Sequence, residues 1–561
     1  MTISDLPPGL VLILGALLLP FAGRVARPVL VLGLPLLTLT LVWQAADGAA
    51  LVLNFLEFQL TPSRADGLSR LFATIFSIMA FAGGLFALNQ RRVVELVAAF
   101  VYAGAAVGVA MAGDLLTFFV FWEIMALAST LVIWSAGGER SYRASMRYVL
   151  MHLLGGGLLM AGIAAHAADT GSLAFTAMTP GTFGTWMILA GILLNAGAPP
   201  ISAWLPDAYP EASYSGTVFL SAFTTKAAVY ALIRGFPGAE VLIPIGLYMV
   251  FYGIIYALLE NDARRILAYS IVNQVGFMVT GVGIGTEMAL NGAAAHAFAH
   301  IIYKALLLMS AGAVLYATNR RKCTDLGGLF QYMPVTTICG IIGALSISAF
   351  PLTSGFISKS MINETAAVEQ LMVIWFLLTA ASAGVFLHAG IKYPWFVFFH
   401  KDSGLRPRDP PINMQLAMIL LSGLSLGLGV WPEPLYAMLP FPVDYRPYTG
   451  PHVVNALQLL LFSGLAFFIL LPQMKRTLTL SLDLDWGYRK LGWVAALMLG
   501  AVLSSAQSSM EARLRSRLRA LLDGLFRHHG PQGILARTWP TGSMVLWVAV
   551  LLAAYLVFYY A

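Results

Sequence analysis

Charged side chains are scarce in this sequence of 561 residues. Only 11% of the residues are charged and 59% are hydrophobic, whereas an ordinary soluble domain has roughly 25% and 45–50%. Together with a mean hydropathy of +0.80, this shortage excludes a water-soluble fold. The net charge of +7 does not indicate nucleic-acid binding, because the arginines stand in short clusters between apolar runs, where membrane proteins carry the charges that set their orientation.

Cysteine is nearly absent as well. Cys323 and Cys339 are too few to hold an iron–sulfur cluster or a zinc ion alone, and we interpret them as small apolar fillers. We find no dinucleotide-binding glycine motif after a strand, no P-loop, no HExxH and no nucleophile elbow. We therefore expect no cofactor, no metal and no enzyme activity of its own. The first residues, MTISDLPPG, lack the basic region and cleavage site of a signal peptide, so the first helix is expected to stay in the mature protein.

Long apolar runs dominate what remains. A hydrocarbon core of roughly 30 Å needs about 20 apolar residues in a helix, and by this measure the chain has about seventeen runs. The basic clusters all follow odd-numbered runs, as Arg24/Arg27, Arg91/Arg92, Arg140/Arg143/Arg147, Arg264/Arg265, Arg320/Arg321/Lys322, Lys401/Arg406/Arg408 and Lys475/Arg476. By the positive-inside rule, the N-terminus is then outside and the odd-to-even loops are cytoplasmic.

One segment disagrees with this orientation. The stretch MEARLRSRLRALLDGLFRHH, within residues 506–541, is Arg-rich and amphipathic, and the alternation places it outside. Either the preceding run sixteen, from Leu491 to Ser505, does not cross the membrane, or the stretch is an interfacial helix on the membrane surface.

Two apolar runs are interrupted in the same way. Run seven is broken in NAGAPPISAWLPDAYPEAS, which begins at Asn195, and run twelve in SAFPLTSGFISKS, which contains Pro351. The two breaks lie five spans apart, so their helices enter the membrane from opposite sides. This pattern is typical of an inverted five-helix repeat whose broken helices expose backbone groups at mid-membrane; two ordinary proline kinks are the alternative.

Two charged residues lie near the midplane of their predicted spans. A charge there costs roughly 2.5–3.5 kcal/mol, so such residues persist mainly where they pair or take part in transport. Glu123 is central in DLLTFFVFWEIMALASTLVIW, and Lys226 is central in GTVFLSAFTTKAAVYALIRGF. A lone carboxylate at Glu123 would be protonated or matched with a cation. Snorkelling of Lys226 is the simpler account, but about ten residues on each side make it the weaker one.

A third set lies on one face of run eleven. His296, His300 and Lys304 follow one another at intervals of four residues in NGAAAHAFAHIIYKALLLMSAG, with Tyr303 beside them. Because histidine titrates near neutrality, this register predicts a proton relay, and Lys359 beyond the break in run twelve ends the series. The alternative is core histidines with satisfied hydrogen bonds; a zinc site lacks further ligands nearby. Lys392 is closer to an interface and is interpreted as an anchor.

These residues bring out a family resemblance. FWEIMALAS, WLPDAYPEAS, FTTKAAVYALIR, NDARRILAYSIVNQVGF, HAFAHIIYKALLL and PLTSGFISKS resemble the antiporter-like subunits shared by Mrp-type cation/proton antiporters and respiratory complex I. The likeness runs from about Val94 to Lys401, and the region from Asn413 to Tyr488 is more similar to the multisubunit Mrp-type monovalent cation/proton antiporters than to the complex I chains. The resemblance implies an all-α, fourteen-helix core, no cofactor, and function only within a complex of several membrane subunits.

The resemblance also assigns segments and residues. It implies N-terminal helices at 1–93, two inverted five-helix repeats at 94–236 and 237–401, and extra C-terminal helices at 402–561. By position it places Glu123, Lys226, His300, Lys304 and Lys359 on a proton pathway, to which the register of run eleven adds His296. One position departs: where the family usually has a helix-seven lysine that pairs with the glutamate, this chain has Asn195, which cannot carry a proton as a cation. Glu123 is then expected either to pair with Lys226 or to be protonated.

The leading hypothesis is therefore a membrane subunit that exchanges H⁺ for Na⁺ or K⁺ in a Mrp-like assembly of the bacterial inner membrane. The second is a proton-translocating subunit of a redox-driven complex, such as a complex I relative or a membrane-bound hydrogenase, whose clusters would have to come from partner subunits. A third, a non-conducting scaffold, is disfavoured because a scaffold has no reason to bury Glu123, Lys226 and Lys359 near the midplane.

Overall fold

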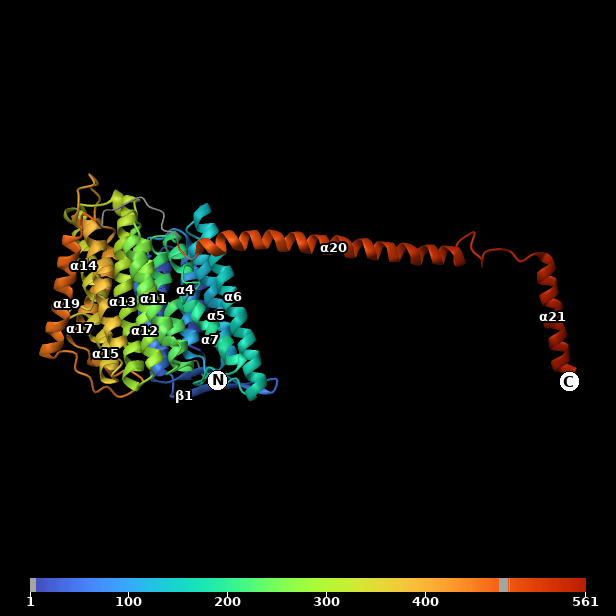
Figure 1. The fold of residues 1–561 in the computed structure, drawn as a ribbon, viewed down its shortest axis with the longest axis horizontal. Helices are drawn as coiled ribbons and strands as arrows, with labels where there is room; N and C mark the ends of the chain where they lie inside the picture. Colours follow the sequence, from blue (N-terminus) through green and yellow to red (C-terminus); the bar gives the residue numbers. More distant parts are fainter. Residues whose placement is uncertain (1–6, 474–482, 484, 561) are drawn as a thin grey trace. The chain divides into compact units, whose positions relative to one another are not determined.

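The computed structural model describes residues 7–473, 483 and 485–560, and the chain divides into two compact units, Met1–Leu484 and Asp485–Ala561. The first unit is a helical bundle with one hairpin (Figure 1). Its N-terminal part comprises α1 (Gly9–Ala16), α2 (Ala26–Gln44), β1 (Gly48–Phe55), β2 (Phe58–Ala65) and α3 (Gly67–Phe86).

The middle of the bundle holds two successive sets of helices. The first comprises α4 (Val93–Met111), α5 (Leu115–Trp134), α6 (Glu139–Thr170), α7 (Phe183–Ala196), α8 (Trp204–Ala208), η2 (Tyr209–Glu211), α9 (Gly216–Ala222) and α10 (Thr224–Gly235). The second comprises α11 (Leu242–Leu259), α12 (Ala263–Ile284), α13 (Glu287–Thr318), η3 (Cys323–Asp325), η4 (Leu329–Gln331), α14 (Pro334–Ile347), α15 (Ser354–Val368), α16 (Met372–Val385) and the π-helical turns η5 (Phe386–Lys392) and η6 (Trp395–Phe399).

The bundle closes with α17 (Ile412–Val430), α18 (Glu433–Tyr436) and α19 (Gly450–Ile469). Among the described residues, 14 helices are long and apolar enough to cross a membrane. Each of the seventeen predicted runs coincides with a helix, the three shorter ones being α1, α7 and α14. The prediction of a mainly helical, multi-pass membrane protein is confirmed. The segment boundaries at residues 94, 237 and 402 stay predictions.

The hairpin of β1 and β2 departs from the all-helical expectation. The strands pair antiparallel from Gly48 with Ala65 to Phe55 with Phe58, around a turn in which Leu56 has a φ of 53°. The main chain of Thr61 donates a hydrogen bond of 2.8 Å to Asp114, which also caps the first turn of α5 through the amide of Thr117. The hairpin thus covers the beginning of the helix that carries Glu123.

Helix α13 lies at the centre of the bundle. It packs against α3, α9 and α10 on one side and against α12, α14, α15 and α17 on the other, and its central residues are almost entirely buried. The two middle sets of helices therefore meet along α13. In Figure 1, α4 to α7 lie at one flank of the bundle and α14, α15, α17 and α19 at the other, with α11, α12 and α13 between them. The two sets also meet through α12, which contacts α8, α10 and η2.

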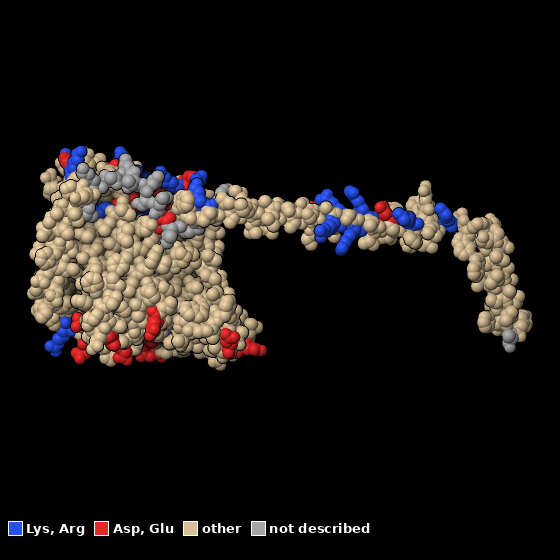
Figure 2. Space-filling model, in the orientation of Figure 1, with Lys and Arg blue, Asp and Glu red and all other residues tan. Residues whose placement is uncertain are grey.

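Charges separate between the two ends of the bundle. Figure 2 shows Lys and Arg gathered at one end, whereas the opposite end, where Figure 1 shows the N-terminus and β1, carries mainly Asp and Glu. This is the distribution that the alternating basic clusters predict for an N-terminus on the outside. The last cluster, Lys475/Arg476, lies outside the described residues.

The predicted interruptions in runs seven and twelve are both present. Helix α7 ends at Ala196, and the chain runs without regular helix from Gly197 to Ala203 before α8 begins. Helix α14 ends at Ile347, and α15 begins at Ser354 after a segment in which Ala349 and Leu352 have positive φ values of 57° and 69°. Strained backbone of this kind costs about 1–3 kcal/mol per residue and persists only where the surrounding structure enforces it.

A third interruption was not predicted. Run eight is divided into α9 and α10 at Phe223, although neither glycine nor proline stands there. The missing intrahelical hydrogen bonds leave carbonyl groups near the end of α9 available to other donors. This interruption lies three residues before Lys226, so it decides the surroundings of that side chain.

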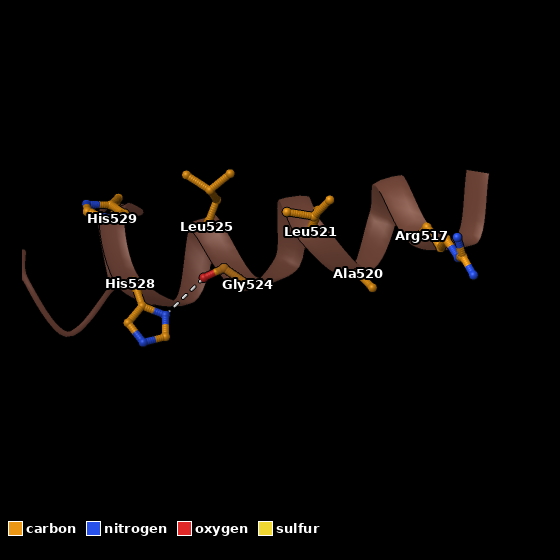
Figure 3. Close-up of a pocket in the computed structure, with 7 residues that line it drawn as sticks. All are labelled: Arg517, Ala520, Leu521, Gly524, Leu525, His528 and His529. Atoms are coloured by element: carbon orange, nitrogen blue, oxygen red, sulfur yellow. Dashed lines mark hydrogen bonds between the residues drawn. The ribbon is translucent and has the colours of Figure 1, made fainter. Parts of the chain in front are cut away.

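The second unit consists of α20 (Asp485–His529) and α21 (Thr541–Tyr560). The Arg-rich stretch is not a separate helix but continues run sixteen within the 45 residues of α20. At about 1.5 Å per residue such a helix is about 68 Å long, roughly twice the hydrocarbon thickness, which favours a course along the membrane over a simple crossing. Figure 3 shows the shallow pocket near its C-terminal end: Leu521 and Leu525 stand on one side, whereas the ring of His528 turns back to the carbonyl of Gly524 at 3.0 Å.

Candidate proton and ion pathway

The predicted pathway residues lie inside the first unit. Lys226, His296, His300, Lys304 and Asn195 have no exposed surface, Lys359 is 2% exposed, and Glu123 is half-buried. They lie on α5, α7, α10, α13 and α15, and α10 contacts both α7 and α13 while α13 contacts α15. The structure therefore buries most of these residues on helices of which α7, α10, α13 and α15 follow one another in contact. That they form one proton pathway stays a prediction.

The carboxylate of Glu123 lies against α6. A Cβ atom built on Gly156 would overlap Oε1 of Glu123, so this carboxylate occupies space that only a glycine leaves open. Oε1 is buried and has no hydrogen-bond partner within the described part of the chain. A buried carboxylate oxygen without a partner is costly unless it is protonated or reached by water.

Neither Asn195 nor Lys226 pairs with Glu123 in this structure. Neither side-chain atom of Asn195 has a hydrogen-bond partner among the described residues. Lys226 instead donates from Nζ to the carbonyl of Ser221 at 2.7 Å and to Oγ1 of Thr225 at 3.0 Å. Of the two expectations for Glu123, pairing with Lys226 is thus not realised in this structure.

A chain of hydroxyl groups leads from α6 to Lys226. The hydroxyl of Tyr148 donates to Oγ of Ser129 at 2.9 Å and lies 3.4 Å from Oγ1 of Thr224, which in turn is 2.5 Å from the hydroxyl of Tyr102. Thr224 is followed directly by Thr225, the side-chain partner of Lys226. Hydroxyl groups both donate and accept, so such a chain can pass a proton once water completes it.

The interruption at Phe223 supplies the main acceptor for Lys226. Ser221 lies in the last turn of α9, where carbonyl groups lack the usual intrahelical donor, and its oxygen accepts the Lys226 amine. At the interruption of run seven, Nε1 of Trp204 donates to the oxygen of Leu194 at 3.0 Å. The interruption of run eight thus supplies a carbonyl to a buried amine in the first half, in addition to the predicted break in run seven.

On α13, Lys304 and His300 lie between the two halves. Nζ of Lys304 donates to Oγ of Ser270 at 2.8 Å and to the carbonyl of Leu267 at 3.3 Å, both on α12. Both ring nitrogens of His300 are buried without a partner in the part of the chain that the structure describes. Lys226 and Lys304 both act electrostatically on this imidazole. The charge state of either lysine therefore affects the charge state of His300.

His296 connects α13 to α15. One of its ring nitrogens is 3.1 Å from Oε1 of Gln274 on α12, and the other is 3.1 Å from Oγ of Ser358, the neighbour of Lys359. The hydroxyl of Tyr303 donates to the same Gln274 oxygen at 3.2 Å. His296 is thus held by hydrogen bonds, which the alternative of a satisfied core histidine also predicts, but its partners lead directly to the next lysine.

Lys359 ends the series beside a cavity. Its Nζ lies 3.4 Å from the carbonyl of Ile347, the last residue of α14, and 4.6 Å from the ring centre of Phe277. Gly355 permits this arrangement, because a Cβ atom there would overlap the carbonyl oxygen of Ser346. A cavity of about 740 Å³ between α15, α16 and α19 is lined by Lys359 together with Asn363, Glu364, His452, Asn455 and Gln458.

The three buried lysines share one environment. Lys226, Lys304 and Lys359 each donate to a backbone carbonyl, and the described part of the chain places no carboxylate within 4.0 Å of their amines. Lys392 is different, since its amine donates to the carbonyls of Ala257, Leu258 and Glu260 at the end of α11, as expected of an anchor. An uncompensated ammonium in a low-dielectric interior costs several kcal/mol, so the three lysines are suited to gain and lose protons rather than to stay charged.

Sequence reasoning missed several polar residues of this region. Gln274, Ser270 and Tyr148 are single polar residues in apolar runs, and neither spacing nor charge distinguishes them. His152 was missed for the same reason, although it is 1% exposed and lies between the rings of Tyr148 and Trp204, with ring centres at 4.0 and 4.7 Å. The signal available in the sequence was a histidine in an apolar run that also has glycines on the same helical face.

The fold and the buried titratable series define a multi-pass membrane protein of the antiporter-like class. The family described as NADH:quinone oxidoreductase/Mrp antiporter, transmembrane, matches residues 112–386. The matched segment is just under half of the chain, and over it the chain is similar to this family. It is 29% identical over 465 residues to the D subunit of the Na(+)/H(+) antiporter of Alkalihalophilus pseudofirmus, an alignment that covers 76% of this chain and 93% of that protein.

Two solved structures share the fold. A chain of the Mrp complex from Dietzia sp. DQ12-45-1b superposes with a TM-score of 0.68 at 20% identity, covering 83% of this chain and 99% of that chain. A chain of the membrane-bound sulfane sulfur reductase, an archaeal respiratory membrane complex, superposes with a TM-score of 0.72 at 22% identity, covering 99% of this chain and 100% of that chain. The second match extends through the C-terminal unit, whereas the first leaves part of this chain without a counterpart.

Proposed function

We propose that this chain is a membrane subunit of a cation/proton antiporter of a bacterial inner membrane, and that it moves H⁺ in exchange for Na⁺ or K⁺. The observation that carries the proposal is the line of buried titratable side chains across the bundle, from Glu123 through Lys226, His300 and Lys304 to Lys359, without carboxylate counterions among the described residues. Burying these groups without pairing them is costly, and proton transfer is the function that accounts for them.

The proposed mechanism is proton hopping between these groups through transient water. A proton on one amine raises the cost of a proton on the next, so uptake at one end promotes release at the other. The backbone carbonyls of Ser221, Leu267 and Ile347 hold each amine in place whether or not it is charged. The cavity beside Lys359 offers an aqueous exit, and His296 with Ser358 leads to it.

The chain is proposed to work with other membrane subunits. Both solved structures with this fold are multisubunit membrane complexes, and α21 exposes almost its whole apolar surface, including Leu546, Leu551 and Phe558. Within the membrane either lipid or a neighbouring subunit can cover an apolar helix surface of this kind.

A second candidate is the proton-translocating subunit of a redox-driven respiratory complex. What favours it is the fold of the C-terminal unit, since the chain of the archaeal respiratory complex covers 99% of this chain. In that case the pathway residues would be the same, and the energy would come from redox centres in partner subunits.

The test is transport by membrane vesicles that contain the chain with its native partners. Under the antiporter proposal, an imposed Na⁺ or K⁺ gradient drives H⁺ flux, and Lys226→Ala or Lys359→Ala abolishes it while the protein is still folded. Normal flux in both variants would contradict the pathway. Purification with the partners then separates the two candidates, because flavin or iron in the isolated complex would favour the redox-driven one.

A further inference from the structure

His152 occupies the position between Glu123 and the hydroxyl chain that leads to Lys226. On α6 it precedes Gly156, against which the Glu123 carboxylate lies, by one helical turn, so both project from the same face. Its ring lies 4.0 Å from the ring of Tyr148, whose hydroxyl is 3.4 Å from Oγ1 of Thr224. His152 therefore lies next to the Glu123 side on the one hand and next to the hydroxyl chain of Tyr148 and Thr224 on the other.

Several polar atoms around His152 are buried without a hydrogen bond of ordinary geometry. They are both ring nitrogens of His152, both side-chain atoms of Asn195 and Oε1 of Glu123, counted within the described residues. The Asn195 amide lies beside the imidazole, close enough to interact with it. Buried polar groups in folded proteins are almost always hydrogen-bonded to protein or water, so this cluster indicates a site that holds water molecules.

The surroundings leave His152 as the group suited to exchange a proton there. Packed on this part of α6 are α5, α7, α8 and η2. They and α6 itself contribute Glu123, Tyr148, Tyr209, and Arg147 with Asp207, which bind one another at 2.7 and 3.0 Å. Asn195 is the residue that α7 contributes, and an amide does not titrate. The ring nitrogens of an imidazole can both accept and donate a proton, and a histidine can therefore carry a proton as a cation, which a tyrosine hydroxyl or an amide does not do.

We propose that His152 is a proton-carrying residue of the pathway, which takes a proton from the Glu123 side through the enclosed water and releases it toward Tyr148 and Thr224. The step changes a neutral imidazole into an imidazolium and back, and no other bond is made or broken. In this chain, His152 on α6 thus supplies the titratable group that Asn195 on α7 does not. The inference rests on the proposed function, since it assigns a residue to that same pathway.

The test compares H⁺ flux in vesicles with the native complex for the wild type and four variants. His152→Gln keeps a polar side chain of similar size but cannot be protonated, and it should lower the flux by about 100-fold or more, as expected for loss of a proton-transfer group. Adding Asn195→Lys to His152→Gln should restore most of the flux, because a lysine on α7 would return a titratable group to the same water site. His166→Gln, at the far end of the same helix, should transport like the wild type.

If His152 served only to fill space, a lysine at position 195 on another helix would not restore the flux. Wild-type flux in His152→Gln would overturn the inference, and so would a folded double variant without rescue. His152→Lys, which keeps a titratable group on α6, answers the same question if the double variant does not fold, and here flux no higher than in His152→Gln would overturn it. Failure of the proposed function looks different, because the wild type itself would then show no flux under a cation gradient.

Discussion

The Glu123 carboxylate lies so close to Gly156 that a Cβ atom built there would overlap Oε1, so any larger residue at position 156 requires this carboxylate to move. Gly157, the next residue on α6, has open space around it instead. Replacing each of the two glycines in turn therefore distinguishes the loss of space beside Glu123 from the general effect of removing a glycine from a helix.

Gly156→Ala should displace Glu123 and lower transport by about 100-fold, the cost of roughly 1 Å of misplacement at a reacting group. Alanine favours helix over glycine by about 1 kcal/mol, so the protein should not lose stability through helix propensity. The measurement is H⁺ flux in vesicles alongside thermal unfolding of the purified protein. Gly157→Ala serves as the matched control and should leave flux unchanged; equal loss in both variants would contradict a specific role for the space at Gly156.

Gln274 is expected to organise the second half of the pathway. Its oxygen accepts the Tyr303 hydroxyl and lies 3.1 Å from His296. Gln274→Leu should leave both groups without this acceptor and reduce H⁺ flux, whereas Gln274→Glu keeps an acceptor and should retain more of it. The comparison is of transport rates at equal protein content, and equal rates in Gln274→Leu and the wild type would show that His296 does not depend on this contact.

The cavity beside Lys359 should be open to water. Asn363 lines it, whereas Thr365, two residues further along α15, is 1% exposed. In a chain whose two native cysteines are replaced, Asn363→Cys should react with a membrane-impermeant thiol reagent, and Thr365→Cys should not. By the predicted orientation the reagent should work from the outside; labelling only from the cytoplasmic side would show that the orientation is inverted.

The ion pair between Asp66 and Arg234 ties the beginning of α3 to the end of α10. Nη2 of Arg234 donates to both Asp66 oxygens at 2.7 and 2.8 Å, and Asp66 also caps α3 through the amide of Ser69. Burial alone would raise the pKa of Asp66, but the hydrogen bonds and charge of Arg234 outweigh it and hold the pKa below its usual value of 3.8. The pair therefore stabilises the fold above that value, and the contribution is lost as the pH falls below it.

Asp66→Asn should remove the charge and keep the cap, since asparagine is as good at this position as aspartate. We expect a loss of about 1 kcal/mol or less, because the carboxylate is partly exposed. Asp66→Ala removes the cap as well and should cost about 1 kcal/mol more. Thermal unfolding in detergent at pH 7 measures both, and equal losses in the two variants would mean that the cap contributes nothing.

The sequence was enough to predict where the apolar helices lie, the interruptions of runs seven and twelve, and the burial of Lys226, His300 and Lys359. The length and hydropathy of the apolar runs predict the helices, and the prolines predict the two interruptions. The rarity of charges in apolar runs predicts that these lysines and the histidine lie inside. The interruption at Phe223 could not be predicted, because phenylalanine and threonine do not break helices by themselves and only the packing around them decides.

The site also has a residue that could not be predicted from the sequence, which is His152. A single histidine in an apolar run is more often an ordinary core residue, and its importance emerges only when the atoms around it are found without partners. Asn195, by contrast, was recognised as a departure from the sequence alone, because its motif fixes its position. Its consequence for Glu123 required the structure, which places Lys226 on Ser221 and Thr225 and not on the carboxylate.

The acceptors of the three buried amines are peptide oxygens, those of Ser221, Leu267 and Ile347. A peptide oxygen is the same atom whichever side chain follows it, so replacing any of these residues by alanine leaves the acceptor where it was. Alanine scanning would therefore report only what these side chains contribute to packing and would overlook the carbonyl contacts that hold the lysines. Amide-to-ester exchange weakens a single carbonyl acceptor, and it is the kind of substitution that would detect them.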